Sequence, residues 1–253
     1  MKETNSLLET AAPAQREESR GASDIVRGAA LAAAGIGIAA LGSARRAQAQ
    51  GTKPLLTFND IPGTGNIKVL NYALALETLE ADLYVQAIAR LQALGVPAND
   101  AALTYVQSFA QIEADHRDFL RGALGASAIT APGQPLATAS FDFGLAAVTD
   151  PNAILNLLYL VENTGTQAYL GAIKYFTDYT YIAVAGGIQA TEARHTATVA
   201  ALLLSRGVTT DPNGNPVSTA PLSNNNNGID IINLEPTAVL AVVTGPNGFT
   251  IIN

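Results

Sequence analysis

The sequence predicts an all-α core: a four-helix bundle made of two helix pairs with a long crossover, plus a short β-rich C-terminal tail. Three observations lead to this prediction. Apolar residues recur at helical spacing in four segments between residues 66 and 206. The first two segments are repeated in the last two. Both histidines of the chain lie in Glu-x-x-His units, one in each half, at Glu113 to His116 and Glu192 to His195.

The composition sets limits on what this bundle can do. With 253 residues, of which 48% are hydrophobic and 14% charged, the chain is long and apolar enough for one well-buried domain with appendages. The lack of cysteine excludes disulfides, thiolate catalysis and cysteine-ligated metal or iron–sulfur sites. The net charge is -7, and no basic cluster follows residue 46, so we expect no nucleic-acid partner.

Residues 1–49 have the features of an export signal. A polar stretch with three arginines precedes an apolar run of fifteen residues at 28–42, and Ala47-Gln48-Ala49 follows. The run is shorter than the roughly twenty residues that a membrane span needs. We therefore expect cleavage after Ala49 and a mature protein in the periplasm or outside the cell. An uncleaved membrane anchor is the alternative.

The segment at 50–65 contains prolines and glycines and is expected to be an extended arm that packs on the bundle. The first helix is predicted from Asn66 to near Gly95, with Glu77 in the middle of its apolar stripe. A second helix, capped by Asn99 or Asp100, carries the first Glu-x-x-His unit in its interior and reaches about residue 122.

A crossover rich in Ala, Thr, Gly and Pro is expected at residues 122–149. Asp150 is placed as the cap of the third helix and Pro151 as its first residue. This helix is expected to run to about Phe176. After a Tyr-rich turn, the fourth helix carries the second Glu-x-x-His unit to about Ser205.

An internal repeat relates the first two predicted helices to the last two. Residues 70–77 align without gaps on residues 155–162, and the match continues through Tyr84 on Tyr169. Each half is therefore a helix with Glu-x6-Tyr followed by a helix with Glu-x-x-His. In a bundle of two such pairs, four carboxylates and two imidazoles can converge.

The run Leu-Asn-Tyr-Ala-Leu-Ala-Leu-Glu at residues 70–77, continued to Tyr84, and the two Glu-x-x-His units resemble the ferritin-like superfamily of dinuclear carboxylate proteins. Within it, the segment is most similar to the exported bacterial ferritin-like, desiccation-related group. The resemblance covers about residues 66–206. It implies a centre of two iron or manganese ions with these ligands: Glu77, Glu113, His116, Glu162, Glu192 and His195. It also implies that the two glutamates of the Glu-x-x-His units bridge the metals.

The residues themselves agree with this ligand set. A buried carboxylate costs several kcal/mol unless it is paired or metal-bound, and no core lysine or arginine is available to pair with four of them. Mixed imidazole and carboxylate ligands suit iron or manganese, although zinc or copper would also bind. Glu80 competes with Glu77 for the ligand role, but its repeat partner is Gly165, so symmetry favours Glu77. A glycine inside the third helix indicates close packing or a distortion near the metals.

Tyr84 and Tyr169 follow the glutamates by seven residues and lie two turns along the same faces. They could hydrogen-bond a ligand, act in electron transfer or be ordinary core tyrosines. No catalytic residue is assigned.

The C-terminal part, residues 207–253, begins as a turn-rich linker. Short strands are predicted in it at 229–232, 239–243 and 249–252. Such strands must pack on the bundle, on the N-terminal arm or on another subunit. We expect a homo-oligomer. Strand exchange could join its subunits, but an intramolecular cover on the bundle is the favoured role of the strands.

Three functions fit the sequence. The first is an exported dinuclear metalloprotein that reacts with peroxide or dioxygen, in the manner of oxidases, peroxidases or catalases. The second is metal binding or storage without turnover. The third is a structural or stress-associated exported protein whose bundle is a scaffold and whose tail mediates assembly. Six costly polar residues on inward faces argue against a purely structural role.

Overall fold

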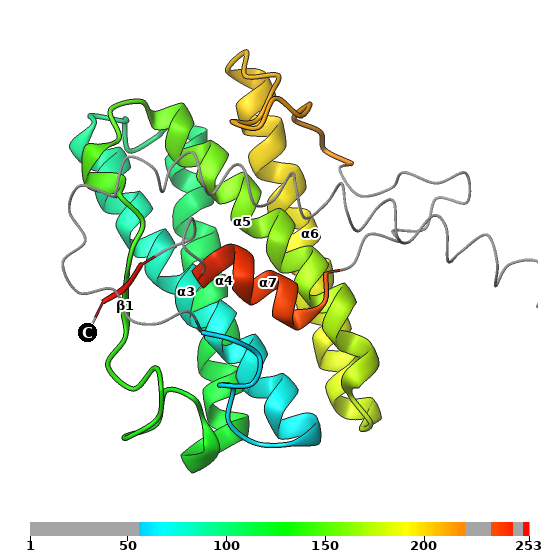
Figure 1. Cartoon of the computed structure of the whole chain (residues 1–253). Coiled ribbons are helices and arrows are strands. Elements are labelled where there is room, and N and C mark those ends of the chain that lie inside the picture. The colour runs from blue at the N-terminus through cyan, green and yellow to red at the C-terminus, as the bar shows by residue number, and fades with distance from the viewer. Residues whose placement is uncertain (1–55, 221–233, 245–249, 253) are drawn as a thin grey trace, which may run out of the picture.

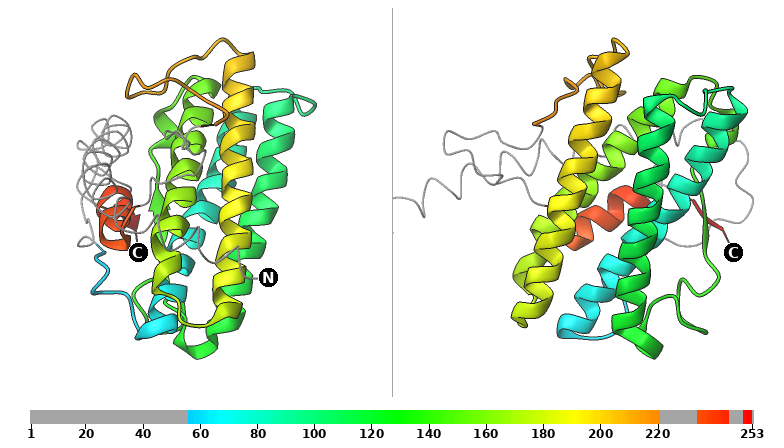
Figure 2. Two further views of the ribbon diagram at one scale, coloured as in Figure 1. Left: turned by 90° about the vertical axis from the view of Figure 1, so that its right-hand side faces the viewer. Right: turned by 180° about the vertical axis from the view of Figure 1, so that it is seen from behind.

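The computed structural model describes residues 56–220, 234–244 and 250–252, and its main body is a four-helix bundle (Figure 1). The long helices are α3 (Gly65–Ala93), α4 (Ala101–Leu124), α5 (Pro151–Ala172) and α6 (Tyr179–Ser205). They pack most extensively as the pairs α3 with α4 and α5 with α6. Figure 2 shows the four helices side by side. The predicted bundle of two helix pairs is thus confirmed.

Helix starts follow the local chemistry of the sequence. The side chain of Asp100 accepts a hydrogen bond from the amide of Ala102, and that of Asp150 accepts one from the amide of Asn152. These bonds satisfy amide groups that have no partner inside a helix. Asp150 is the predicted cap of its helix, and Asp100 is one of the two predicted candidates, Asn99 being the other. Pro151 occupies the first position of α5, as predicted.

The crossover between α4 and α5 contains more structure than expected. It holds the short 3₁₀ helices η1 (Gly125–Ser127) and η2 (Leu145–Ala147) and the strand β1 (Ser140–Asp142). A third 3₁₀ helix, η3 (Ile173–Tyr175), follows α5. The α-helix therefore ends at Ala172, a few residues before the predicted end near Phe176.

The β-rich tail is a prediction that the structure corrects. Residues Pro236–Thr244 form the helix α7, where a strand was predicted at 239–243. The buried side chains of Val239, Leu240, Val242 and Val243 recur at helical spacing and α7 packs on α5, so packing overrides the β propensity of valine here. The strand predicted at 229–232 lies outside the described residues.

One strand is present in the described part of the tail. This strand, β2 (Thr250–Ile252), pairs antiparallel with β1, with Phe141 opposite Ile251. Since β2 pairs within the chain, this structure gives no support to strand exchange between subunits. Homo-oligomerisation stays a prediction.

Helix α5 is buried on nearly all its faces because the tail covers the side that the bundle leaves open (Figure 1). The approach is close at Gly171, where a Cβ atom would lie 1.9 Å from the carbonyl oxygen of Leu234. Nearby, the amide of Leu234 donates a hydrogen bond of 3.3 Å to the carbonyl of Gln167. A residue with a side chain at position 171 would therefore push the tail away from α5.

The predicted export signal at 1–49 and the first part of the arm lie outside the described residues. Leu56 and Ile61, from the described part of the arm, are buried in the core. Among the described residues, none of the helices has the length and apolar character needed to cross a membrane.

Candidate metal centre

The structure brings together the six residues that the sequence singled out. Glu77 comes from α3, Glu162 from α5, and each Glu-x-x-His unit from α4 or α6. Their ligand atoms form two groups, each within 4.8 Å: Glu77, Glu113, His116 and Glu192 in one, and Glu113, Glu162, Glu192 and His195 in the other. Glu113 and Glu192 belong to both groups. The two groups are therefore joined through two shared carboxylates.

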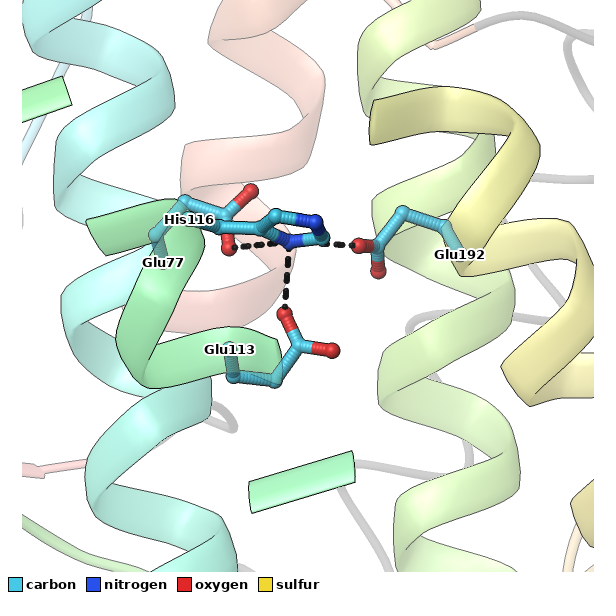
Figure 3. Close-up of side chains that lie close together, drawn as sticks. All are labelled: Glu77, Glu113, His116 and Glu192. Carbon is cyan, nitrogen blue, oxygen red and sulfur yellow. Dashed lines mark hydrogen bonds and ion pairs between the residues drawn. The ribbon is translucent and has the colours of Figure 1, made fainter. Parts of the chain in front are cut away.

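Each imidazole points one nitrogen at several carboxylates. The Nδ1 atom of His116 lies 3.1 Å from Glu113 Oε2, 3.4 Å from Glu77 Oε2 and 3.5 Å from Glu192 Oε1 (Figure 3). The Nδ1 atom of His195 lies 2.8 Å from Glu113 Oε1 and 3.4 Å from Glu162 Oε1. One ring nitrogen carries at most one proton, so it cannot satisfy all of these oxygens.

Many buried polar atoms of the cluster accordingly make no hydrogen bond. They are Glu77 Oε2, Glu113 Oε1, Glu162 Oε2, both carboxylate oxygens of Glu192 and Nδ1 of His195. The short distance between His195 Nδ1 and Glu113 Oε1 is not a hydrogen bond, because the two groups are not aligned for one. Buried polar atoms without partners are rare and costly, and cations at these positions would satisfy them. The residues therefore fit bound metal ions.

The electrostatics lead to the same conclusion. Burial, and then mutual repulsion, raises the pKa of Glu162 and Glu192, and burial raises the pKa of Glu77 to about 7. Glu113 is different: burial raises its pKa, but the hydrogen bond from His116 and the positive charges of His116 and His195 outweigh this and lower it to about 2. Among the described residues, no lysine or arginine forms an ion pair with these four glutamates.

The same carboxylates raise the pKa of both histidines. Burial alone would lower it, but hydrogen bonds and charges from Glu113 and Glu77 raise the pKa of His116 to about 10. Likewise, Glu113 and Glu162 outweigh burial and raise the pKa of His195 to about 9. In the absence of metal, the protons of the histidines supply the positive charge that the glutamates require.

Tyr84 and Tyr169 reach across the bundle to the opposite half of the repeat. The hydroxyl of Tyr84, on α3, donates to Glu162 on α5, and the hydroxyl of Tyr169, on α5, donates to Glu77 on α3. Both tyrosines are buried. Of the roles considered from the sequence, hydrogen bonding to a candidate ligand is the one that the geometry supports.

Comparison with known proteins gives the family. A model of the ferritin-like domain matches residues 65–205, which is more than half of the chain and includes all six clustered residues. The chain belongs to the ferritin-like family. A search of curated proteins found no match. The membership and the Glu/His cluster together support binding of metal ions by this ferritin-like domain.

Sequence reasoning missed one aromatic contact in this ferritin-like domain. The ring of Phe109, on α4, stacks on the imidazole of His195, with centroids 3.9 Å apart and planes 25° apart, and meets Tyr84 edge to face. Phe109 precedes Glu113 by four residues and so shares its helix face. This spacing could have identified Phe109 as a neighbour of the cluster from the sequence. The contact fixes the orientation of an imidazole that no backbone group holds.

The two histidines differ in their access to solvent. The side chain of His116 is 15% exposed, whereas that of His195 is 3% exposed and is covered by Phe109. The glutamates are fully buried. The cluster is therefore closest to solvent on the side of His116.

A fifth buried carboxylate adjoins the cluster. Glu80, on α3, is 3% exposed, and its Oε2 atom makes no hydrogen bond. Gly165 leaves the room for it, because a Cβ at that position would lie 2.9 Å from Glu80 Oε1 and 2.8 Å from Glu192 Oε2. This explains the glycine in the interior of α5. Symmetry favoured Glu77 over Glu80 as the ligand, and Glu77, not Glu80, belongs to one of the two groups.

Proposed function

We propose that this ferritin-like domain binds two iron or manganese ions and that the centre reacts with hydrogen peroxide or dioxygen. The observation that carries the proposal is the pair of overlapping ligand groups that share Glu113 and Glu192. The ligands would be Glu77, Glu113, His116, Glu162, Glu192 and His195.

The charge and chemistry of the donors select the metals. Four glutamates carry four negative charges when they are ionised, which two divalent ions balance. The donors are oxygen and nitrogen atoms without sulfur, and a set of this kind suits iron or manganese. Ionised carboxylates without such balance would be very unfavourable at zero exposure.

Reactivity with peroxide or dioxygen follows from the surroundings of the cluster. When bound, two divalent ions can supply the two electrons that, with two protons, reduce one hydrogen peroxide molecule to two water molecules. The protein contributes a buried, largely apolar setting that excludes bulk water. Tyr84 and Tyr169 hold Glu162 and Glu77 in place, and the exposed edge of His116 offers the path of entry.

A small apolar cavity lies beside Tyr169, whose hydroxyl donates to Glu77. It has a volume of about 10 Å3 and lies between α3 and α5, where Tyr169 contributes to its wall. The rest of the lining is apolar or aromatic and consists of Val69, Tyr72, Ala73, Leu76, Ala168, Ala172 and Phe176. Apolar cavities hold apolar molecules better than water.

The test begins with metal analysis of the purified protein, for which we expect two ions per chain. Peroxide and dioxygen consumption by the iron-loaded and manganese-loaded protein is then compared with that of a Glu113→Ala, Glu192→Ala variant. Asp115→Ala is the matched control, because Asp115 is exposed on the same helix. Fewer than about one ion per chain would contradict metal binding. Equal consumption by wild type and the double variant would leave metal storage, or a scaffold, as the function.

We also propose that the protein is exported, with residues 1–49 as a cleaved signal. The polar stretch, the apolar run and the Ala-Gln-Ala sequence before Gln50 support this. The similarity of residues 70–84 to exported desiccation-related proteins supports a role in stress protection outside the cytoplasm.

A further inference from the structure

We propose that Glu80 is a fifth carboxylate of the metal centre. It is not needed to bind two divalent ions, but it stabilises the centre when the total metal charge exceeds that of two divalent ions. The inference rests on the proposed function only in assuming that two metal ions bind. It concerns the asymmetry between the two halves of the repeat, where Glu80 corresponds to Gly165.

The position of Glu80 is the first argument. It follows Glu77 by three residues on α3 and so lies on the same helix face. It is buried at 3% exposure, and its Oε2 atom has no hydrogen-bond partner. A carboxylate in such a place is costly unless a cation compensates it. Among the described residues, no lysine or arginine forms an ion pair with Glu80.

The room made by Gly165 is the second argument. Glycine destabilises a helix interior by about 1 kcal/mol relative to alanine. Gly165 has no positive φ angle, so the backbone does not require glycine there. A Cβ atom at this position would come within 3 Å of both Glu80 Oε1 and Glu192 Oε2. The glycine therefore accommodates two carboxylates, one of which belongs to both ligand groups.

The charge balance assigns a role to the fifth carboxylate. The four glutamates of the ligand groups already balance two divalent ions, and Glu80 belongs to neither group. Removal of one electron from each ion, by an oxidant such as hydrogen peroxide, raises the total metal charge to six. The four glutamates then leave two positive charges unbalanced, and Glu80 compensates one of them. Its charge therefore favours the oxidised centre over the reduced centre.

The experiment is an anaerobic redox titration of the iron-loaded protein, followed by its absorption spectrum. The variant is Glu80→Gln, which keeps the shape of the side chain but cannot ionise. Asp115→Asn is the control, since it removes an exposed charge on α4. We expect Glu80→Gln to bind two ferrous ions as wild type does. We expect its ratio of oxidised to reduced iron at a given potential to fall at least tenfold, or about 59 mV for one electron.

A second variant tests the room at Gly165. Gly165→Ala crowds Glu80 and Glu192 and should lower the same ratio, while Gly187→Ala, at an exposed helix position with no atom within 4 Å of the added Cβ, should not. A Glu80→Gln shift no larger than that of Asp115→Asn would overturn the inference. So would loss of ferrous iron from Glu80→Gln, because Glu80 would then be a ligand of the divalent centre. If wild type binds two ions and Glu80→Gln leaves the ratio of oxidised to reduced iron unchanged, only this inference is refuted. If wild type binds no ions, the proposed function is refuted too.

Discussion

Tyr169 Oη lies 2.5 Å from Glu77 Oε1, and this hydrogen bond joins the second half of the repeat to the first. The hydroxyl of Tyr84 makes the corresponding bond to Glu162 in the opposite direction. Each half therefore positions a candidate ligand of the other half. The pairing ties α3 to α5 at the level of the cluster and makes the two helix pairs interdependent for metal binding.

We predict that Tyr84→Phe and Tyr169→Phe each weaken metal binding by about 10–100-fold, as is usual when a group that orients a ligand is lost. Competition with a chromogenic chelator measures this. Tyr72→Phe is the matched control, because Tyr72 is also buried on α3 but its hydroxyl makes no hydrogen bond. Equal affinity in all three variants would show that the two tyrosines are only core residues.

We predict that the metal-free protein loses stability as the pH rises from about 5 to 10. The folded-state pKa of Glu77 is raised from 4.5 to about 7, and those of His116 and His195 from 6.5 to about 10 and about 9. For each of these three groups, at a pH between its unfolded-state and folded-state pKa, the folded protein binds more protons than the unfolded protein. The histidine contribution is therefore complete below pH 6.5 and is lost as the pH passes the folded values. Glu113 acts oppositely, since its contribution is lost as the pH falls from 4.5 toward 2.

Bound metal should reverse the trend, because it replaces these protons and its affinity rises with pH. Thermal unfolding with a chelator, and with excess manganese, at several pH values provides the measurement. A melting temperature of the chelated protein that increases steadily from pH 5 to pH 9 would contradict the prediction.

The sequence was sufficient for the helices and for the six clustered side chains, because both depend on periodicity along one helix. Asp100 and Asp150 cap their helices as predicted, and each Glu-x-x-His unit presents both side chains to the bundle interior. Contacts between helices were harder to predict. Spacing places Tyr84 on the same face as Glu77, but its hydroxyl reaches Glu162 because the two helices pack side by side.

The tail shows a second limit of sequence reasoning. Valine and leucine at 239–243 have β propensity and also fit one face of a helix. Residues 236–244 form a helix because one face of it packs on α5, and the surface of α5 exists only after the bundle has formed. Gly165 indicated close packing, but the sequence does not show that carboxylates approach it, or that a backbone carbonyl approaches Gly171.

We predict that the mature protein begins at Gln50, with a net charge near -8 after loss of a signal with six basic and five acidic residues. The intact mass of the protein from the exported fraction of its native cell decides this. Cleavage at another nearby site would move the boundary only. A full-length chain that sediments with membranes would instead establish an uncleaved anchor.

We predict that Gly171→Ala detaches the tail from α5 and lowers the free energy of unfolding by about 2–4 kcal/mol, the cost of exposing two or so aliphatic side chains. The added Cβ would lie 1.9 Å from the carbonyl oxygen of Leu234, and a backbone atom cannot yield as a flexible side chain can. The segment must move, and α7 then loses its contact with α5. Gly187→Ala, where the Cβ meets no atom within 4 Å, should instead raise stability by about 0.5–1 kcal/mol. Urea unfolding measures both effects, and limited proteolysis should cut α7 faster in Gly171→Ala than in wild type. Equal stability and protection in the two variants would mean that the tail does not depend on this close approach.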